Sequence, residues 1–358
     1  MTGGKIVDQC CKDAGDAVFL QDFGMEDFTA SQGFTNYLNT VASRWGELAK
    51  AWISELVLRT SYRSDFVNAD IKNIRCQNGH IRPLVVVGAR LYFFIWRANF
   101  LVADYWTLTD KLYEGLIPKP NADLWPNENL INELEEAVSI YFGKGDLSSA
   151  NFTKFNQLVS TIHPIPSLVY TWIVDMAELF ILFHEVQHVF PSPPNLRVNL
   201  QLSGESNISS TRQAKWLEEE KADVNSAYFL LISATDYLQK TFGLSLADAK
   251  KVAAGTVFSG ADAALHTLAM LEKIRYGEIS IEDAATRSEY RTHPPSFQRR
   301  NTLSQACKIL CLNIAGEEMW NIVRDSVAAE MIARDKLFNT FFASRKDFIT
   351  KIRNGGIV

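Results

Sequence analysis

Large apolar residues recur at helical spacing over most of the chain. Before residue 70 they follow one another mainly at steps of three and four residues, which is the period of an amphipathic helix. These residues are Phe34, Tyr37, Leu38, Val41, Trp45, Leu48 and Trp52. The same period returns at about residue 99 and continues through the rest of the sequence, interrupted by proline-rich loops. The pattern predicts a predominantly helical protein.

The segment between residues 71 and 96 has a different pattern. Its runs IKNIRC, IRPLVVV and RLYFFIW are rich in branched and aromatic residues, and Asn78-Gly79 separates the first run from the second. An Asn-Gly pair between two such runs is typical of a hairpin turn. We therefore expect a small antiparallel sheet at about residues 71–96. A small sheet followed by many helices predicts the α+β class.

Composition and charge exclude several classes of protein. A hydrophobic fraction of 47% with 22% charged residues is typical of a folded globular chain and not of a disordered or fibrous one. A net charge of −5 supplies no positive field to collect phosphates, so nucleic acid is not an expected partner. Two apolar stretches, 84–106 and 168–190, both contain charged residues. They are expected to be buried in protein, and no integral membrane segment is expected.

The cysteines are odd in number and show no spacing typical of a disulfide framework. Cys10 and Cys11 are adjacent and cannot easily bridge each other. We therefore expect a reducing compartment, and the absence of an apolar leader at the N-terminus adds to the expectation of a cytoplasmic protein. Cys307 and Cys311 are four residues apart, which would suit half a metal site, but small buried hydrophobic residues are the preferred interpretation.

The segment His184-Glu185-Val186-Gln187-His188 is the strongest chemical signal in the sequence. Residues four apart lie above one another on a helix, so both imidazoles can reach one metal ion. Glu185 lies beside them, where a carboxylate can take a proton from a metal-bound water and return it to a leaving amine. The alternative is a buried helix on which the two histidines only pack or bond to the backbone.

A zinc site of this kind needs a third protein ligand. Glu219 and Asp223 are again four residues apart, on a second predicted helix. In such a pair the glutamate can bind the metal while the aspartate accepts the outer N–H of a ligand histidine, here expected to be His184. Glu218 and Glu220 are instead interpreted as an acidic, solvated helix turn.

His293 and Arg299 are further candidates. A histidine before two prolines cannot continue a helix, so His293 belongs to a loop or a helix start, where functional side chains are common. It could donate to the oxyanion of a tetrahedral intermediate or bond near Glu219. Arg299 could pair with Asp223 or with a substrate carboxylate, whereas a solvated Arg299-Arg300 pair is the structural alternative.

These motifs resemble those of the gluzincin metallopeptidases, in which HExxH is followed by a helix bearing ExxxD. Glu219 to Asp223 is similar to the ExxAD helix of the HtpX-like and CAAX-processing endopeptidases, and Thr292-His293-Pro294-Pro295 with Arg299 resembles their THPP…R element. The resemblance implies a zincin-like core and covers about residues 168–300. Those enzymes usually carry transmembrane helices, which are not expected here, so membrane-protein or prenyl-protein substrates are not implied.

A vaguer resemblance, over about residues 175–230, is to the Lit-type phage-exclusion peptidases, which keeps a host-defence role open. The chain is accordingly divided into an N-terminal helical region with the small sheet, residues 1–160, whose role is unassigned, and a helical zincin-like metallopeptidase core, residues 161–358. No long linker separates the two regions.

The leading functional hypothesis is a cytoplasmic zinc endopeptidase that acts on a protein or peptide substrate. His184, His188 and Glu219 would bind one zinc ion, with Glu185 as general base and then acid. The first alternative is a regulatory or sensor protein that keeps the zincin-like core and works by binding a partner. The second is a helical scaffold without metal. The sequence does not indicate the substrate, any activating trigger or the oligomeric state.

Overall fold

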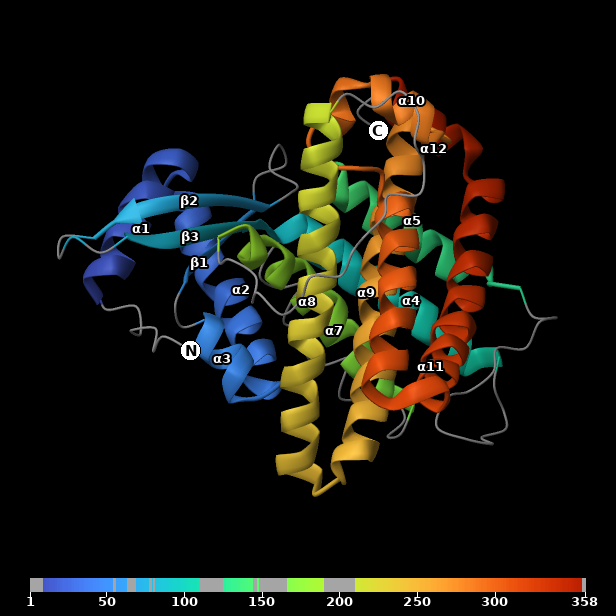
Figure 1. Ribbon diagram of the computed structural model, residues 1–358. Helices are drawn as coiled ribbons and strands as arrows, with labels where there is room; N and C mark the ends of the chain where they lie inside the picture. The colour runs from blue at the N-terminus through green and yellow to red at the C-terminus, as the bar shows by residue number, and fades with distance from the viewer. Residues whose placement is uncertain are drawn as a thin grey trace.

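The computed structural model describes residues 9–53, 56–62, 69–76, 79, 81–109, 125–143, 147, 166–189 and 210–355. Most of these residues are helical, and three strands form a small sheet (Figure 1). The strands are β1 (Val57–Ser61), β2 (Ala69–Arg75) and β3 (Ile81–Gly88). The helices are α1 (Gln9–Phe23), α2 (Met25–Arg44), α3 (Glu47–Ile53), α4 (Ala89–Thr109), α5 (Glu128–Tyr141), α7 (Pro166–Val189), α8 (Ser210–Phe242), α9 (Leu246–Tyr276), α10 (Ile281–Thr286), η1 (Ser288–Tyr290), α11 (Ser296–Ser344) and α12 (Lys346–Arg353). The α+β expectation is confirmed at this level.

The sheet is mixed and begins earlier than its sequence pattern predicts. Its strand order is β1-β3-β2, with β2 antiparallel and β1 parallel to the central β3. The hairpin of β2 and β3 is as predicted, and Gly79 has a positive φ of 80° in the connection between them. The expectation of a purely antiparallel sheet is wrong. β1 lies in the segment before residue 70, for which the pattern predicts helices. That prediction is wrong for β1, because a strand of five residues is too short to show a clear alternation.

The predicted strand over RLYFFIW is also wrong, because these residues belong to α4. Leu91, Phe94, Ile95 and Ala98 contact the main core, while Phe93, Trp96 and Phe100 pack in a second cluster. The helix is therefore buried on more than one side. A continuous apolar run cannot be assigned to a buried helix or a buried strand from periodicity alone.

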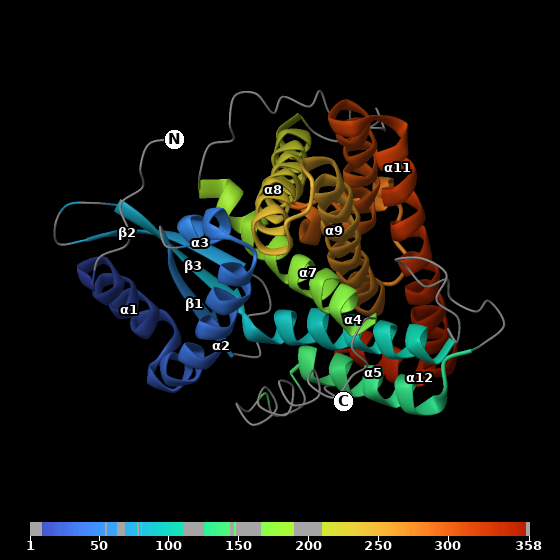
Figure 2. The same ribbon diagram turned by 90° about the horizontal axis from the view of Figure 1, so that it is seen from below.

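The sheet is packed between α1 and the helical part of the molecule. Alternate residues of β3 point to opposite faces, so Leu84 and Val86 pack with Phe19 of α1, whereas Val85 and Val87 join the main core. Figures 1 and 2 show the sheet and α1–α3 at one end, while α8, α9 and α11 lie at the other. The main core includes residues of α2, β3, α4, α5, α7, α8, α9, α11 and α12. It therefore combines residues from both sides of residue 160, the predicted boundary between the two regions.

Cys11 and Cys76 form a disulfide that ties α1 to the residue after β2, with the two Cα atoms 4.8 Å apart. The expectation of unpaired cysteines is therefore wrong for this pair. A separation of 65 residues gives no local spacing signal, and disulfides are typical of oxidising compartments. The cysteine count thus no longer supports a cytoplasmic location. Cys307 and Cys311 are free and buried, as expected.

None of the helices in the described ranges combines the length and the apolar character that a bilayer crossing requires.

Helix α7 carries the two motif histidines, and α9 packs closely against it. A Cβ atom on Gly260 of α9 would lie 2.5 Å from the Cβ of Met176 and 2.8 Å from the backbone oxygen of Ile173. Non-bonded atoms do not approach this closely, so the side chain must be absent for the two helices to meet. Gly260 thus allows the close approach of α9 that fixes the position of α7.

Gly260→Ala should destabilise the fold by about 1–3 kcal/mol, the usual cost of overpacking a core. Gly255→Ala in the same helix is the control, because its Cβ would meet only Ser326 Oγ at an ordinary 3.6 Å. Alanine is favoured over glycine inside helices, so this control should be neutral or slightly stabilising. Denaturant unfolding of both variants measures the difference. Equal midpoints for the two variants would show that α7 and α9 are not held this closely.

Candidate metal centre

Three metal-ligating side chains converge where α7 and α8 face each other. The Nε2 atoms of His184 and His188 lie 3.2 Å apart. Oxygens of the Glu219 carboxylate lie 3.1 Å from Nε2 of His184 and 3.4 Å from Nε2 of His188. One ligand atom from each residue thus falls within 4.8 Å of the others. The structure brings together the three residues that the sequence proposed as ligands.

The local sequence explains why these side chains point inward. On α7, apolar residues surround the histidines and fix the helix in the core, with Leu182, Phe183 and Val186 fully buried. His184 therefore lies inside, with only 3% of its side chain exposed, whereas His188, one turn later, is 30% exposed. On α8, Glu219 lies one turn after the buried Trp216. The three ligand atoms consequently meet at the edge of the core, where solvent can reach them.

Asp223 and Arg299 support His184 from the opposite side of its ring. Oδ1 of Asp223 lies 2.8 Å from Nδ1 of His184. The guanidinium of Arg299 donates two hydrogen bonds to Asp223, at 2.8 Å from Nε and 2.7 Å from a terminal nitrogen. This leaves Nε2 of His184 directed at Glu219 and His188, which is the arrangement expected of a metal ligand with an outer carboxylate. Arg299 is buried and paired, so the alternative of a solvated Arg299-Arg300 pair is wrong.

The charges around His184 favour a cation. Burial alone would raise the pKa of Asp223, but Arg299 and His184 hold it well below its usual range. Burial and Arg299 lower the pKa of His184, whereas Asp223 and Glu219 outweigh them and raise it to about 9. Burial would likewise raise the pKa of Glu219, yet its hydrogen bond to His184 and the nearby positive groups lower it. A metal ion would take the place of the proton that the carboxylates stabilise on His184.

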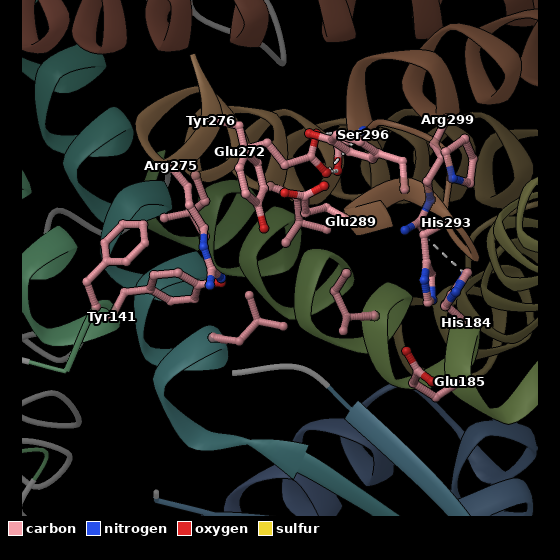
Figure 3. Close-up of a pocket in the computed structure, with 17 residues that line it drawn as sticks. Tyr141, His184, Glu185, Glu272, Arg275, Tyr276, Glu289, His293, Ser296 and Arg299 are labelled. Atoms are coloured by element: carbon pink, nitrogen blue, oxygen red, sulfur yellow. Dashed lines mark hydrogen bonds between the residues drawn. The ribbon is translucent and has the colours of Figure 1, made fainter. Parts of the chain in front are cut away.

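Glu185 lies beside the three candidate ligands and is not one of them. Its side chain is partly exposed and lines a pocket that His184 and His293 also line (Figure 3). It makes no hydrogen bond with any residue in the described part of the chain. Burial raises the pKa of its carboxyl group above the usual range. An unengaged carboxylate with increased basicity is suited to accept a proton from a water molecule.

His293 approaches the ligands from the loop before α11. Its Nε2 atom lies 3.4 Å from Oε1 of Glu219, and its side chain is 53% exposed. Two contacts hold this loop: the indole N–H of Trp216 donates to the carbonyl of Tyr290 at 2.9 Å, and Ser296 donates its N–H and hydroxyl to Glu272. The structure therefore places His293 next to Glu219, and its side chain also lines the pocket.

Several buried acids outside the candidate ligand set have hydrogen-bond partners in distant parts of the chain. Glu220 is not solvated as expected: it is 1% exposed, accepts hydrogen bonds from Thr302 and Gln298, and burial raises its pKa to about 7. Two further buried acids, Asp175 and Glu178 of α7, are also paired: Asp175 accepts from Arg44 and Trp45, and Glu178 accepts from Tyr37. Their partners lie in α2 or directly after it, at least 130 residues away, so no local signal could have identified them.

Comparison with known proteins provides no relative for this chain: no family model matches it, and neither does any curated protein or solved structure. The functional argument therefore depends on the motifs and on the geometry described above.

Proposed function

We propose that the chain is a zinc-dependent endopeptidase with a zincin-like helical core. The observation that carries the proposal is the convergence of His184, His188 and Glu219 on one point, with the unengaged carboxylate of Glu185 beside it. The first three supply the donor set and the fourth supplies an acid–base group. A site that served only to stabilise the fold would not need Glu185.

The donor set fits zinc better than the other common biological cations. Two imidazoles and one carboxylate are the ligands of many catalytic zinc sites, in which the fourth position stays open. Calcium and magnesium prefer oxygen donors alone. The outer contacts on His184 from Asp223 are also of the kind that support such a metal. His184, His188 and Glu219 would therefore hold the ion.

The remaining residues can carry the proton transfers of peptide hydrolysis. When bound, zinc supplies Lewis acidity that lowers the pKa of a coordinated water to about 7 and polarises a carbonyl group. Glu185 then receives the proton of the attacking water and delivers it to the amine that leaves. His293, which lines the pocket, donates to the developing oxyanion. Asp223 keeps His184 in the required tautomer.

Metal analysis and identification of new protein termini together test this function. The purified protein should contain about one zinc per chain, and His184→Ala should contain none. After incubation with cell lysate, zinc-loaded protein should generate new termini that metal-stripped protein does not generate. Zinc without any new termini would favour the alternative of a zinc-stabilised binding protein, and absence of zinc would overturn the proposal.

Asp223→Asn should weaken zinc affinity by roughly 10- to 100-fold without abolishing the site, as loss of an outer carboxylate usually does. The change also breaks a buried pair with Arg299, so stability should fall as well. Competition with a chelator of known affinity measures the first effect, and thermal unfolding measures the second.

Asp262→Asn is the matched control, because Asp262 forms a similar two-bond pair with Arg300, the next residue along α11. Asp262 contacts none of the proposed ligands among the described residues. Its substitution should lower thermal stability but leave zinc affinity unchanged. If both variants bound zinc like the wild type, the contact from Asp223 to His184 would have no role in metal binding.

A further inference from the structure

The pocket beside the proposed zinc site extends well beyond it. It has a volume of about 230 Å³ and is lined at one end by His184, Glu185 and His293. At the other end it is lined by Arg275 together with Tyr141, and Figure 3 shows these two side chains directed toward each other. A peptide that enters at the metal end can therefore place a distant side chain near Arg275.

Arg275 has no carboxylate partner in the described part of the chain. The structure gives its guanidinium only a cation–π contact, 5.4 Å from the ring centre of Tyr276. Other basic groups nearby are engaged: Lys273 pairs with Glu278, and Arg299 pairs with Asp223. The side chain of Arg275 is exposed to solvent. It is therefore an available positive group at the far end of the pocket.

Glu272 and Glu289, the acidic residues of the pocket other than Glu185, do not pair with Arg275. Glu272 accepts three hydrogen bonds from Ser296, and Glu289 bonds to the hydroxyl of Ser288 at 3.3 Å. No ion pair joins either of them to Arg275. Burial raises the pKa of the Tyr141 phenol above its usual range, so this group stays a neutral donor beside the guanidinium. Two donors thus lie at the same end of the pocket, which suits an anionic group.

The length of the pocket indicates where on a substrate that anion would lie. Leu268, Leu271 and Arg275 come from successive turns of α9 and line one wall. Seven residues of helix span about 10 Å, at 1.5 Å per residue. An extended peptide covers about 3.3 Å per residue, so about three residues fit along this wall. Leu91 and Ile181 also line the pocket, so apolar side chains lie between its two ends.

We propose that Arg275 is a specificity-determining residue that binds a substrate carboxylate about three residues from the cleaved bond. This inference rests on the proposed endopeptidase function and names the substrate class of that site. The carboxylate can come from an acidic side chain or from the C-terminus of the substrate. Both present the planar, two-oxygen group that a guanidinium binds with two parallel hydrogen bonds.

Fluorescence-quenched decapeptides test the proposal directly. Each peptide has neutral residues except at one position, which carries glutamate or glutamine, and each is made with a free or an amidated C-terminus. Wild-type protein loaded with zinc should cleave the peptides carrying the favoured carboxylate with kcat/KM roughly 10- to 100-fold higher than their neutral counterparts, as expected for a hydrogen bond to a charged group. Mass spectrometry should place the cut at a fixed distance of about three residues from that carboxylate.

Arg275→Gln should reduce the ratio between acidic and neutral peptides to about one, while Arg275→Lys should restore part of it. Lys273→Gln is the matched control, because Lys273 lies on the same helical turn, does not line the pocket and already has a partner. This control should keep the wild-type ratio. An unchanged ratio in Arg275→Gln would overturn the inference while leaving the proposed peptidase function intact.

A binding measurement separates failure of the inference from failure of the function. Zinc-loaded Glu185→Gln is titrated with the same peptides carrying a fluorescein label, and a second variant adds Arg275→Gln. If wild type cleaves no peptide but acidic peptides bind 10-fold or more weakly after loss of Arg275, the peptidase function fails and the carboxylate subsite stands. If no peptide is cleaved and binding shows no preference for a carboxylate, both are overturned.

Discussion

Glu185→Gln should lower peptide hydrolysis by at least about 100-fold while zinc content and thermal stability stay near those of the wild type. Glutamine keeps the shape of the side chain but cannot accept the proton of the attacking water. The structure leaves Glu185 outside the ligand set and without a hydrogen bond to any described residue, so its loss removes no contact that holds the fold. Rates on a cleaved peptide, with metal analysis and thermal unfolding of the same samples, measure all three quantities.

Gln187→Ala is the control for this experiment, because Gln187 belongs to the same segment of α7 and is not among the proposed ligands. It should keep most of the wild-type activity. The Glu185→Gln protein also retains the pocket, so it should trap peptides that the wild type cleaves. If Glu185→Gln and wild type produced identical sets of new termini from lysate, or if neither produced any, the zinc-stabilised binding protein would become the better hypothesis.

The sequence was most informative where the chemistry depends on one helical turn. His184 and His188, like Glu219 and Asp223, are four residues apart, and a helix necessarily places such pairs on one face. The structure then adds what spacing alone cannot supply, namely that the two faces meet with Asp223 2.8 Å from His184. The partner of Arg299 was left open among several in the sequence, and the fold selects Asp223.

Features that depend on distant parts of the chain could not be read in this way. The strand β1 pairs with β3 in parallel. A parallel pair needs a crossover connection instead of a hairpin, so no turn motif in the sequence predicts it. Cys11 and Cys76 meet only because α1 packs on the sheet. Glu220 is buried because α11 brings Thr302 to it from 82 residues away. In each case the local pattern was ordinary, and the tertiary contact decided the outcome.

The helix α4 illustrates a different reason for error. Its residues between Leu91 and Trp96 are branched or aromatic and would suit a strand. The helix continues instead because its apolar residues find neighbours on several sides, in the main core and in the cluster around Phe93 and Trp96. Tertiary burial thus outweighs intrinsic preference. The consequence for the site is direct, since Leu91 of this helix lines the proposed substrate pocket.

Glu219→Ala should abolish zinc binding as completely as His188→Ala does. A site with two histidines and one carboxylate has no spare ligand, so removal of any one leaves only two protein donors. Among the described residues, Glu219 is the carboxylate that groups with His184 and His188. Zinc per chain after dialysis against a weak chelator is the measurement, with circular dichroism to show that the helices persist.

Two neighbouring glutamates of α8 provide controls with distinct expected results. Glu218 is exposed, so Glu218→Ala should change neither zinc content nor stability. Glu220 is buried and bonded to Thr302 and Gln298, so Glu220→Gln should alter stability while zinc is retained. Three adjacent acids would then show three separable outcomes: loss of metal, no effect, and a change in stability alone. Retention of zinc by Glu219→Ala, or its loss from Glu218→Ala, would remove the ligand assignment on which the proposed peptidase function depends.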